Sequence, residues 1–261
     1  MNRSAVEAMR NVIILGCGRS GTSMTAGVLA SAGYFMGHKM LNVGRINNPY
    51  GNFEDQEINA LNERLLAQIV PTPTMVDGVL SHRDRPRENQ RWLARLPVGT
   101  PIPAIAELLP KMQELTSHTP YCFKDPRFSY TLPVWRPFLA DAIFLCIFRE
   151  PHKAVQSILK QLQDAPHLRG LEMDAAKALD VWCLMYRHIL ELHRHEGQWM
   201  FLHYDQLLSS QGISRLASLT EAEITSLLPN PELRKVYAEW AVTREADDIY
   251  KSLSDLAEFN P

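Results

Sequence analysis

The sequence predicts an α/β fold: a single doubly wound domain over residues 1–261, with a central parallel sheet of about five strands and helices on both faces. The 261 residues are 46% hydrophobic and 21% charged, which excludes a disordered or fibrous chain. Short apolar runs alternate with longer segments of helical periodicity, as in an open parallel sheet. The run 142–148 (AIFLCIF) is apolar at every position. This is typical of a parallel strand buried on both faces.

A strand at 11–16 ends at a glycine-rich turn, and a helix at 21–32 ends at Gly33. Apolar spacing and helix stop signals predict further helices at 54–69, 103–117, 126–139, from Pro151 and at 173–195. Further strands are expected at 121–124, 142–148 and 199–204. Short helices should fill 211–261, one of them opening with the capping box Thr220–Glu223.

Residues 71–100 interrupt this alternation. They hold four of the seventeen prolines and the charged run HRDRPRENQR, with little apolar periodicity. We expect a long excursion that acts as a lid or acceptor loop, with the charged run solvated.

Composition excludes several classes of partner. The net charge is −2, so nothing draws the whole chain to nucleic acid or to an anionic membrane. The longest apolar run is too short to span a bilayer. The first ten residues lack the apolar stretch of a signal peptide, so we expect a cytoplasmic protein. Four scattered cysteines without metal-ligand spacing indicate reduced core thiols. A homodimer stays open, because nothing in the sequence decides the oligomeric state.

A phosphate-binding loop follows the first strand. Residues 16–23 read GCGRSGTS, which fits the P-loop frame G-x4-G-x-[ST] between a strand and a helix. Glycines let successive N–H groups face one anion, and the helix N-terminus adds its dipole. The cofactor-binding residues predicted here are Gly18, Arg19, Ser20, Gly21, Thr22 and Ser23. Thr22 stands where a nucleotidase loop carries lysine, so Arg19 is the nearby cation.

A second cation stands at the end of the strongest strand. Magnesium-dependent nucleotide chemistry uses an acidic residue at such a position. Arg149 occupies it here. This pattern favours an anion bound by protein cations without a metal, and it weakens the hypothesis of an atypical P-loop kinase.

These residues resemble the bacterial branch of the sulfotransferases that use 3′-phosphoadenosine 5′-phosphosulfate (PAPS). The resemblance covers roughly residues 11–210. It rests on the GCGRSGTS loop, on Arg149 with Ser157 eight residues later, on NPYGNFED at 48–55 and on KDPR at 124–127. It implies PAPS as cofactor, leaving 3′-phosphoadenosine 5′-phosphate (PAP). It also implies Arg19 at the 5′-phosphosulfate, and Arg149 with Ser157 at the 3′-phosphate.

The resemblance further implies metal-independent, in-line transfer of a sulfuryl group to a hydroxyl or amine. The acceptor would be a small molecule or a carbohydrate, and the sequence does not identify it. By analogy with phosphoryl transfer, the chain must neutralise the leaving phosphate, which Arg19 would do. Lys124 could reach the sulfonate. Alternatively, Lys124 and Arg127 form ion pairs with Asp125 or another carboxylate.

The acceptor needs a base, and the strand lysine is not followed by a histidine. By motif Glu54 is the best candidate, with a pKa raised by burial. Glu54 could instead be a charge at a helix N-terminus. Asp55, Glu57 and His38 are competing candidates for the base.

Two features favour ordinary structural roles. Trp182 and Tyr186 lie at helical spacing, which favours core positions over an adenine stack, and no stacking residue is assigned. His193 and His195 end a helix, which favours pairing with the helix dipole over metal binding. A non-catalytic nucleotide-binding protein on the same scaffold remains an alternative function.

Overall fold

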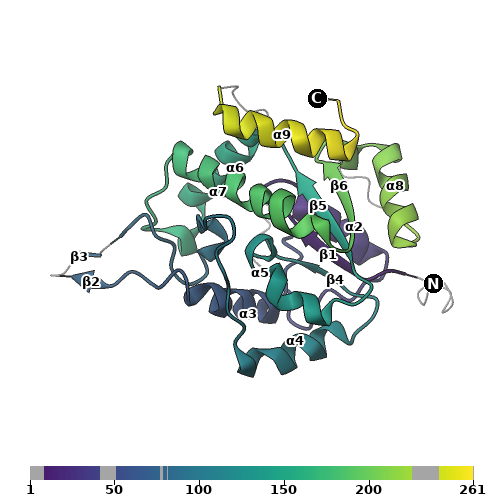
Figure 1. The fold of residues 1–261 in the computed structure, drawn as a ribbon, viewed down its shortest axis with the longest axis horizontal. Coiled ribbons are helices and arrows are strands. Elements are labelled where there is room, and N and C mark those ends of the chain that lie inside the picture. Colours follow the sequence, from purple (N-terminus) through teal and green to yellow (C-terminus); the bar gives the residue numbers. More distant parts are fainter. Residues whose placement is uncertain (1–8, 42–50, 77–78, 81, 225–240, 261) are drawn as a thin grey trace.

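A computed structural model of the chain describes residues 9–41, 51–76, 79–80, 82–224 and 241–260. Figure 1 shows a central sheet with helices packed on both sides. The sheet contains β1 (Val12–Leu15), β4 (Cys122–Lys124), β5 (Ile143–Phe148) and β6 (Gln198–His203). Their order is β4-β1-β5-β6, and every neighbouring pair is parallel. The doubly wound α/β fold is confirmed.

The described sheet has four strands, so the prediction of about five was too high. The segment after the first helix adds only an isolated bridge between Phe35 and Tyr121. Two residues after this bridge, Gly37 has φ +117°, outside the extended region of a strand.

Two cores lie on the two faces of the sheet. Side chains alternate along a strand, so Ile13 and Leu15 join one core while Val12 and Ile14 join the other. The first core contains residues of α3 (Gln56–Ala67), α4 (Leu109–Thr116), α5 (Phe128–Trp135), α6 (Pro151–Asp164), α7 (Ala175–Arg187) and α9 (Arg244–Ala257). The second contains residues of α2 (Thr22–Ser31) and α8 (Ser210–Thr220). This layering brings the loop between β1 and α2 to the carboxyl edge of the sheet.

Strand positions were predicted to within one or two residues, whereas several helices are shorter than predicted. The helix expected at 103–117 is a 3₁₀ turn (Ala106–Leu108) followed by α4, whose first turn contains Pro110. Proline lacks an N–H and suits that first turn, which fixes where α4 begins. The helix expected at 126–139 is α5 followed by a 3₁₀ turn at Arg136–Phe138.

The helix expected at 173–195 also changes type before its end. After α7 the chain forms a π-helical turn at His188–Leu192 and then a 3₁₀ turn at His193–His195.

The excursion at 71–100 has structure of its own. A hairpin of β2 (Met75–Val76) and β3 (Val79–Leu80) projects from the body, at the left of Figure 1. The chain then returns through a 3₁₀ turn at Arg91–Leu93. The charged run is not solvated throughout, because Gln90 and Arg91 are buried.

The predicted capping box at Thr220 is wrong. Thr220 ends α8, and its hydroxyl donates to the carbonyl of Leu216 at 2.7 Å. Glu221 follows with a left-handed φ of +54°, which stops the helix there. Ser209 caps the start of α8 instead. Among the described residues, no helix is both long enough and apolar enough to cross a membrane.

Candidate functional site

The loop at 16–23 curves from the end of β1 into α2. Positive φ angles at Gly16, Arg19 and Gly21 bend it back on itself. Gly21 takes the N-cap position of α2, so the loop leads directly into a helix N-terminus, which favours an anion. A Cβ on Gly18 would lie 2.6 Å from the ring of Trp92, so the excursion at 71–100 packs directly on the loop.

A cleft of about 460 Å³ opens beside this loop. Among the described residues that line it, three are cations, Arg19, Lys124 and Arg127, and Glu54 is the only carboxylate. The other lining residues are Gly18, Thr22, Ser23, Leu41, Asn52, Asn59, Asn89, Trp92, Pro126, Gln161 and His167. The excess of positive charge and the loop together suit an anionic ligand.

The structure brings Arg19 and Ser157 into contact. Arg19 Nε donates to Ser157 Oγ at 3.0 Å, joining the loop to α6 across 138 residues of sequence. Arg149 follows β5, is buried, and lies with its guanidinium carbon 4.4 Å from the ring centroid of Tyr204. The Tyr204 ring in turn lies against Gly21. Arg149 is therefore next to the loop but does not line the cleft, and neither do Ser20, Gly21 and Ser157.

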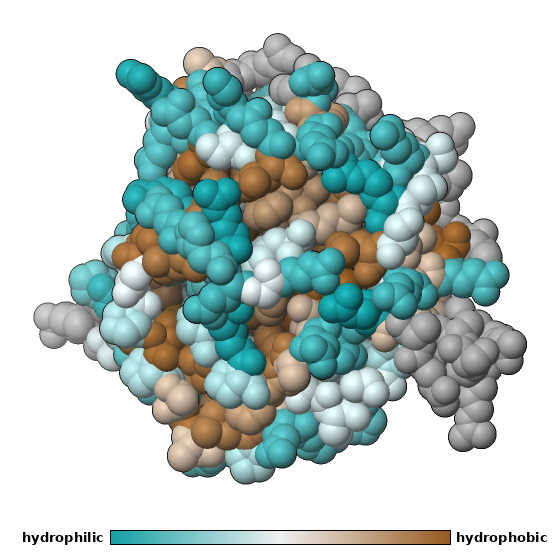
Figure 2. All heavy atoms as spheres, turned by 45° about the vertical axis from the view of Figure 1, so that its right-hand side comes forward, coloured by the Kyte–Doolittle hydropathy of each residue, from teal (hydrophilic) through white to brown (hydrophobic). Residues whose placement is uncertain are grey.

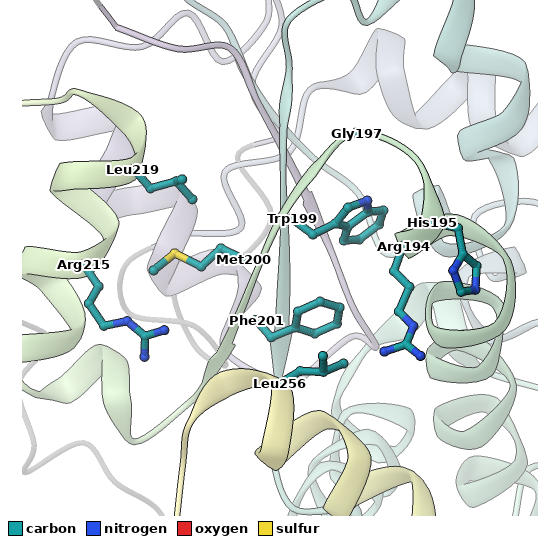
Figure 3. A pocket seen from close by; sticks show the side chains of 9 residues that line it. All are labelled: Arg194, His195, Gly197, Trp199, Met200, Phe201, Arg215, Leu219 and Leu256. Atoms are coloured by element: carbon teal, nitrogen blue, oxygen red, sulfur yellow. The ribbon is translucent and has the colours of Figure 1, made fainter.

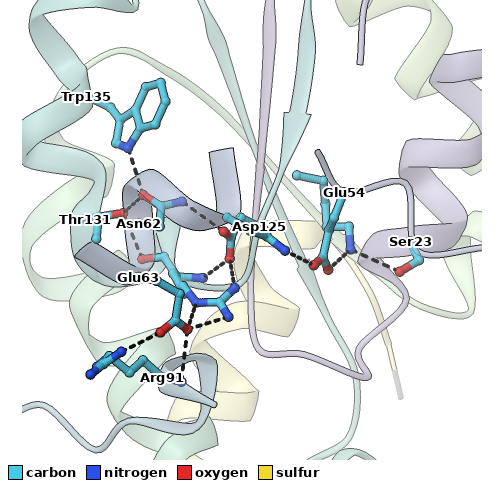
Figure 4. A network of polar contacts seen from close by, with 11 residues as sticks. Ser23, Glu54, Asn62, Glu63, Arg91, Asp125, Thr131 and Trp135 are labelled. Atoms are coloured by element: carbon cyan, nitrogen blue, oxygen red, sulfur yellow. Dashed lines mark hydrogen bonds and ion pairs between the residues drawn. The ribbon is translucent and has the colours of Figure 1, made fainter. Parts of the chain in front are cut away.

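Lys124 links the loop to the candidate base. Its ammonium donates to Ser23 Oγ at 3.2 Å and forms an ion pair with Glu54, as Figure 4 shows. Both side chains are largely buried, with 2% of Lys124 and 16% of Glu54 exposed. β4 ends at Lys124, which places the ammonium at the carboxyl edge of the sheet.

The pKa of the Glu54 carboxyl is lowered, and the predicted rise is wrong. Burial alone raises this pKa. The charge of Lys124, with hydrogen bonds from Lys124 and from Asn59 at 2.9 Å, outweighs burial and keeps the carboxylate ionised. A carboxylate held in this way can accept a proton once the ammonium moves off it.

The competing base candidates lie elsewhere. Asp55 caps α3, accepting from the N–H groups of Glu57 and Ile58 at 2.8 and 3.0 Å. Glu57 pairs with two lysine side chains, and His38 contacts a glutamate on α4. None of the three candidates lines the cleft. Residues 48–50 of the NPYGNFED motif lie outside the described residues.

Comparison with known protein families shows to which family the chain belongs. A model described as the sulfotransferase family matches residues 11–212, which include the loop and the whole described sheet. The chain belongs to the sulfotransferase family.

Two solved sulfotransferase domains share the fold. The domain from the Synechococcus PCC 7002 olefin synthase superposes with a TM-score of 0.54 at 17% identity, covering 94% of each chain. The domain from the curacin biosynthetic pathway gives 0.53 at 13% identity, covering 94% of this chain and 98% of that one. The comparison with curated proteins gave no significant match. At these identities the likeness concerns the fold alone.

A buried polar network adjoins the cleft and shares Arg127 with its lining (Figure 4). Arg127 donates to Asp125 at 2.9 Å and to Glu63 at 2.7 Å, and Glu63 also accepts from Arg91 at 2.8 Å. Asn62 donates to Asp125 at 3.0 Å. The network therefore connects the end of β4 to α3 and to the excursion at 71–100. The alternative role for Arg127, an ion pair with Asp125, is what the structure shows.

A larger cavity of about 630 Å³ lies along the edge strand β6. In Figure 3, Met200 points toward Arg215 and Leu219 on α8, while Trp199 and Phe201 point to the other side of β6. Figure 2, which turns the right-hand side of Figure 1 forward, shows apolar surface between polar side chains. Because this cavity contains no residue of the phosphate loop, the smaller cleft is the candidate site.

The predicted core residues are confirmed. Trp182 and Tyr186 are fully buried, and Tyr186 donates its hydroxyl to the carbonyl of Ile147 at 2.8 Å. Cys17, Cys122, Cys146 and Cys183 are all buried free thiols.

The two helix-end histidines differ from each other. His193 is buried, which lowers its pKa to about 4, and its Nε2 lies 3.0 Å from the carbonyl of Ser129. His193 is therefore uncharged at neutral pH and does not pair with a helix dipole. His195 is exposed.

Proposed function

We propose that this member of the sulfotransferase family transfers a sulfuryl group from PAPS to a hydroxyl or amine of a small-molecule or carbohydrate acceptor. One observation carries the proposal: the Lys124 ammonium contacts both Ser23 of the phosphate loop and the Glu54 carboxylate. A group that neutralises phosphate and a group that accepts a proton thus face the same cleft. Sulfuryl transfer needs both.

The residues present suit a donor with two anionic ends. When bound, PAPS supplies a sulfuryl group on a phosphate leaving group. The backbone N–H groups of the loop, with Arg19, would hold the 5′-phosphosulfate at the N-terminus of α2. Ser157 contacts Arg19 at 3.0 Å and, with the buried Arg149, would hold the 3′-phosphate. The tight packing of Gly18 against Trp92 leaves no room for a side chain at that point of the loop.

Lys124 and Glu54 have different roles in the proposed reaction: Lys124 stabilises negative charge, and Glu54 accepts a proton. As the ammonium turns to the anionic donor, Glu54 loses its partner and becomes the stronger base. Glu54 then takes the proton of the acceptor hydroxyl while that oxygen bonds to sulfur and the bond from sulfur to the phosphate oxygen breaks. Arg19 and Lys124 stabilise the charge left on the phosphate. Every step uses side chains of the chain, without a metal.

The test is PAP release from PAPS across a panel of carbohydrate, phenol and amine acceptors, in buffer containing a metal chelator. Glu54→Gln should lower turnover by about 10²–10⁴-fold, the usual contribution of a general base. Glu57→Gln is the matched control, because Glu57 pairs with Lys39 and Lys111 outside the cleft and should keep near-normal turnover. Turnover of ATP that requires magnesium, with none of PAPS, would contradict the proposal.

A further inference from the structure

Three potential metal ligands cluster on the surface, and none of them lines the cleft. His38 lies beyond the Phe35 bridge, Glu114 lies in the last turn of α4, and His118 lies two residues beyond the end of that helix. A ring nitrogen of each histidine and a carboxylate oxygen of Glu114 all fall within 4.8 Å of one another. His38 Nε2 is 2.9 Å from Glu114 Oε1.

Both histidines are already oriented. His118 Nδ1 lies 3.0 Å from the backbone carbonyl of Glu114, so it can donate there and leave Nε2 as the free ligand. Histidines that bind metals commonly donate their other ring N–H in this way. The His118 ring stacks on Phe35 with centroids 4.6 Å apart, and the His38 ring packs edge-on against both, at 4.8 and 5.0 Å. Little side-chain freedom is left to lose on binding an ion.

The carboxylate is oriented as well. Lys111 Nζ lies 2.7 Å from Glu114 Oε2 and 2.9 Å from Glu57. Lys111 thus orients Oε2 of Glu114, and Oε1 lies next to His38. Glu114 can therefore offer one oxygen to an ion, and its other oxygen keeps the ion pair with Lys111.

We propose that His38, Glu114 and His118 bind one zinc ion, with water completing the coordination. Two imidazoles and a carboxylate with an open position form a ligand set that suits Zn²⁺. The four thiols, which would otherwise compete for zinc, are buried. About 38% of the His38 side chain and 42% of the Glu114 side chain are exposed, so an ion can reach the cluster from solvent.

A bound zinc ion would fasten the segment around residues 35–41 to α4. In that segment the backbone N–H of Lys39 donates to the Asp55 carboxylate at 2.6 Å, and Leu41 lines the cleft. A bound ion at this site would therefore hold a segment that contributes to the cleft lining. None of its three ligands takes part in the proposed transfer reaction. The zinc proposal can therefore be tested independently of the proposed function.

The test is calorimetric titration of the full chain with zinc chloride after treatment with chelator and desalting. We expect one equivalent to bind, and His38→Ala and His118→Ala each to weaken binding by at least about tenfold, the smallest effect usual for groups around a metal. His195→Ala, at an exposed histidine outside the cluster, should bind as the wild type does. No binding to the wild type, or equal binding by the His38 and His118 variants, would overturn the proposal.

A second measurement uses the wild type alone, so it does not depend on how the variants fold. Crystals grown with zinc chloride and measured at the zinc absorption edge should show an anomalous peak between His38, Glu114 and His118. Peaks only at other positions would overturn the assignment.

Discussion

Glu63 holds two guanidinium groups together inside the protein, and the variant Glu63→Gln tests what that charge contributes. Its carboxylate accepts from Arg127 Nε at 2.7 Å and from Arg91 Nη1 at 2.8 Å. Only 6% of the Glu63 side chain and 4% of each arginine side chain are exposed. Glutamine keeps the shape of the side chain but leaves Arg91 without its charge partner and Arg127 with Asp125 alone.

Breaking a buried ion pair from one side costs about 3–5 kcal/mol, since an uncompensated charge remains in a medium of low polarity. We expect a loss of that size in the free energy of unfolding, measured by urea denaturation followed by circular dichroism. Glu57→Gln is the control on the same helix. Its partners Lys39 and Lys111 are largely solvated, and such pairs contribute about 0–1 kcal/mol.

The double variant Glu63→Met with Arg127→Met sharpens this test. It leaves Arg91 without Glu63 and also leaves the buried Asp125 without Arg127, so the double variant should lose more stability than Glu63→Gln alone. A loss below about 1 kcal/mol for Glu63→Gln, equal to that of the surface control, would refute the argument that the network is a buried electrostatic unit.

Three further predictions concern the loop, the base and a buried histidine. In Gly18→Ala the added Cβ would meet the Trp92 ring at 2.6 Å, so the phosphate loop must shift. The variant should stay folded but lose its binding of PAP in calorimetry, and unchanged affinity would exclude the loop geometry described above. Lys124→Met should raise the pKa of Glu54, because burial is then opposed only by the Asn59 hydrogen bond and the charge of Arg127. The acid limb of the pH–rate profile should move to higher pH, and an unmoved limb would contradict the role of Glu54. His193 has a folded-state pKa of about 4, below its ordinary 6.5, so its neutral form contributes stability that is full above pH 6.5 and is lost as the pH falls toward 4. At 1.36 kcal/mol per pH unit the loss is roughly 3 kcal/mol, and His193→Phe should flatten the stability curve in that window, whereas an unchanged slope would count against it.

The strands and the phosphate loop could be predicted because their signals are local. The run at 142–148 needs both faces buried wherever it lies, and β5 spans Ile143–Phe148. GCGRSGTS carries its glycines at positions where the structure has positive φ, at Gly16 and Gly21. Helix ends were harder, because proline and left-handed residues such as Glu221 decide them one at a time.

The partners within the site could not be predicted from local signals. Glu54 and Lys124 are 70 residues apart, and their ion pair reverses the expected direction of the Glu54 pKa. The direction of the Glu54 pKa shift depends on a balance between burial and one neighbouring charge. Neither the burial nor the neighbour can be read from a single sequence. Arg91 was expected to be solvated with its charged run, whereas tertiary contact with Glu63 buries it. The domain count stays a prediction.

The most direct test of the central claim is calorimetric titration of the metal-free protein with PAP, beside adenosine 5′-monophosphate, for the wild type and Arg149→Ala. We expect tight binding of PAP by the wild type, much weaker binding of adenosine 5′-monophosphate, and loss of that preference in Arg149→Ala. Equal binding of the two nucleotides by the wild type would contradict it, because the cations beside the loop would then not recognise a 3′-phosphate.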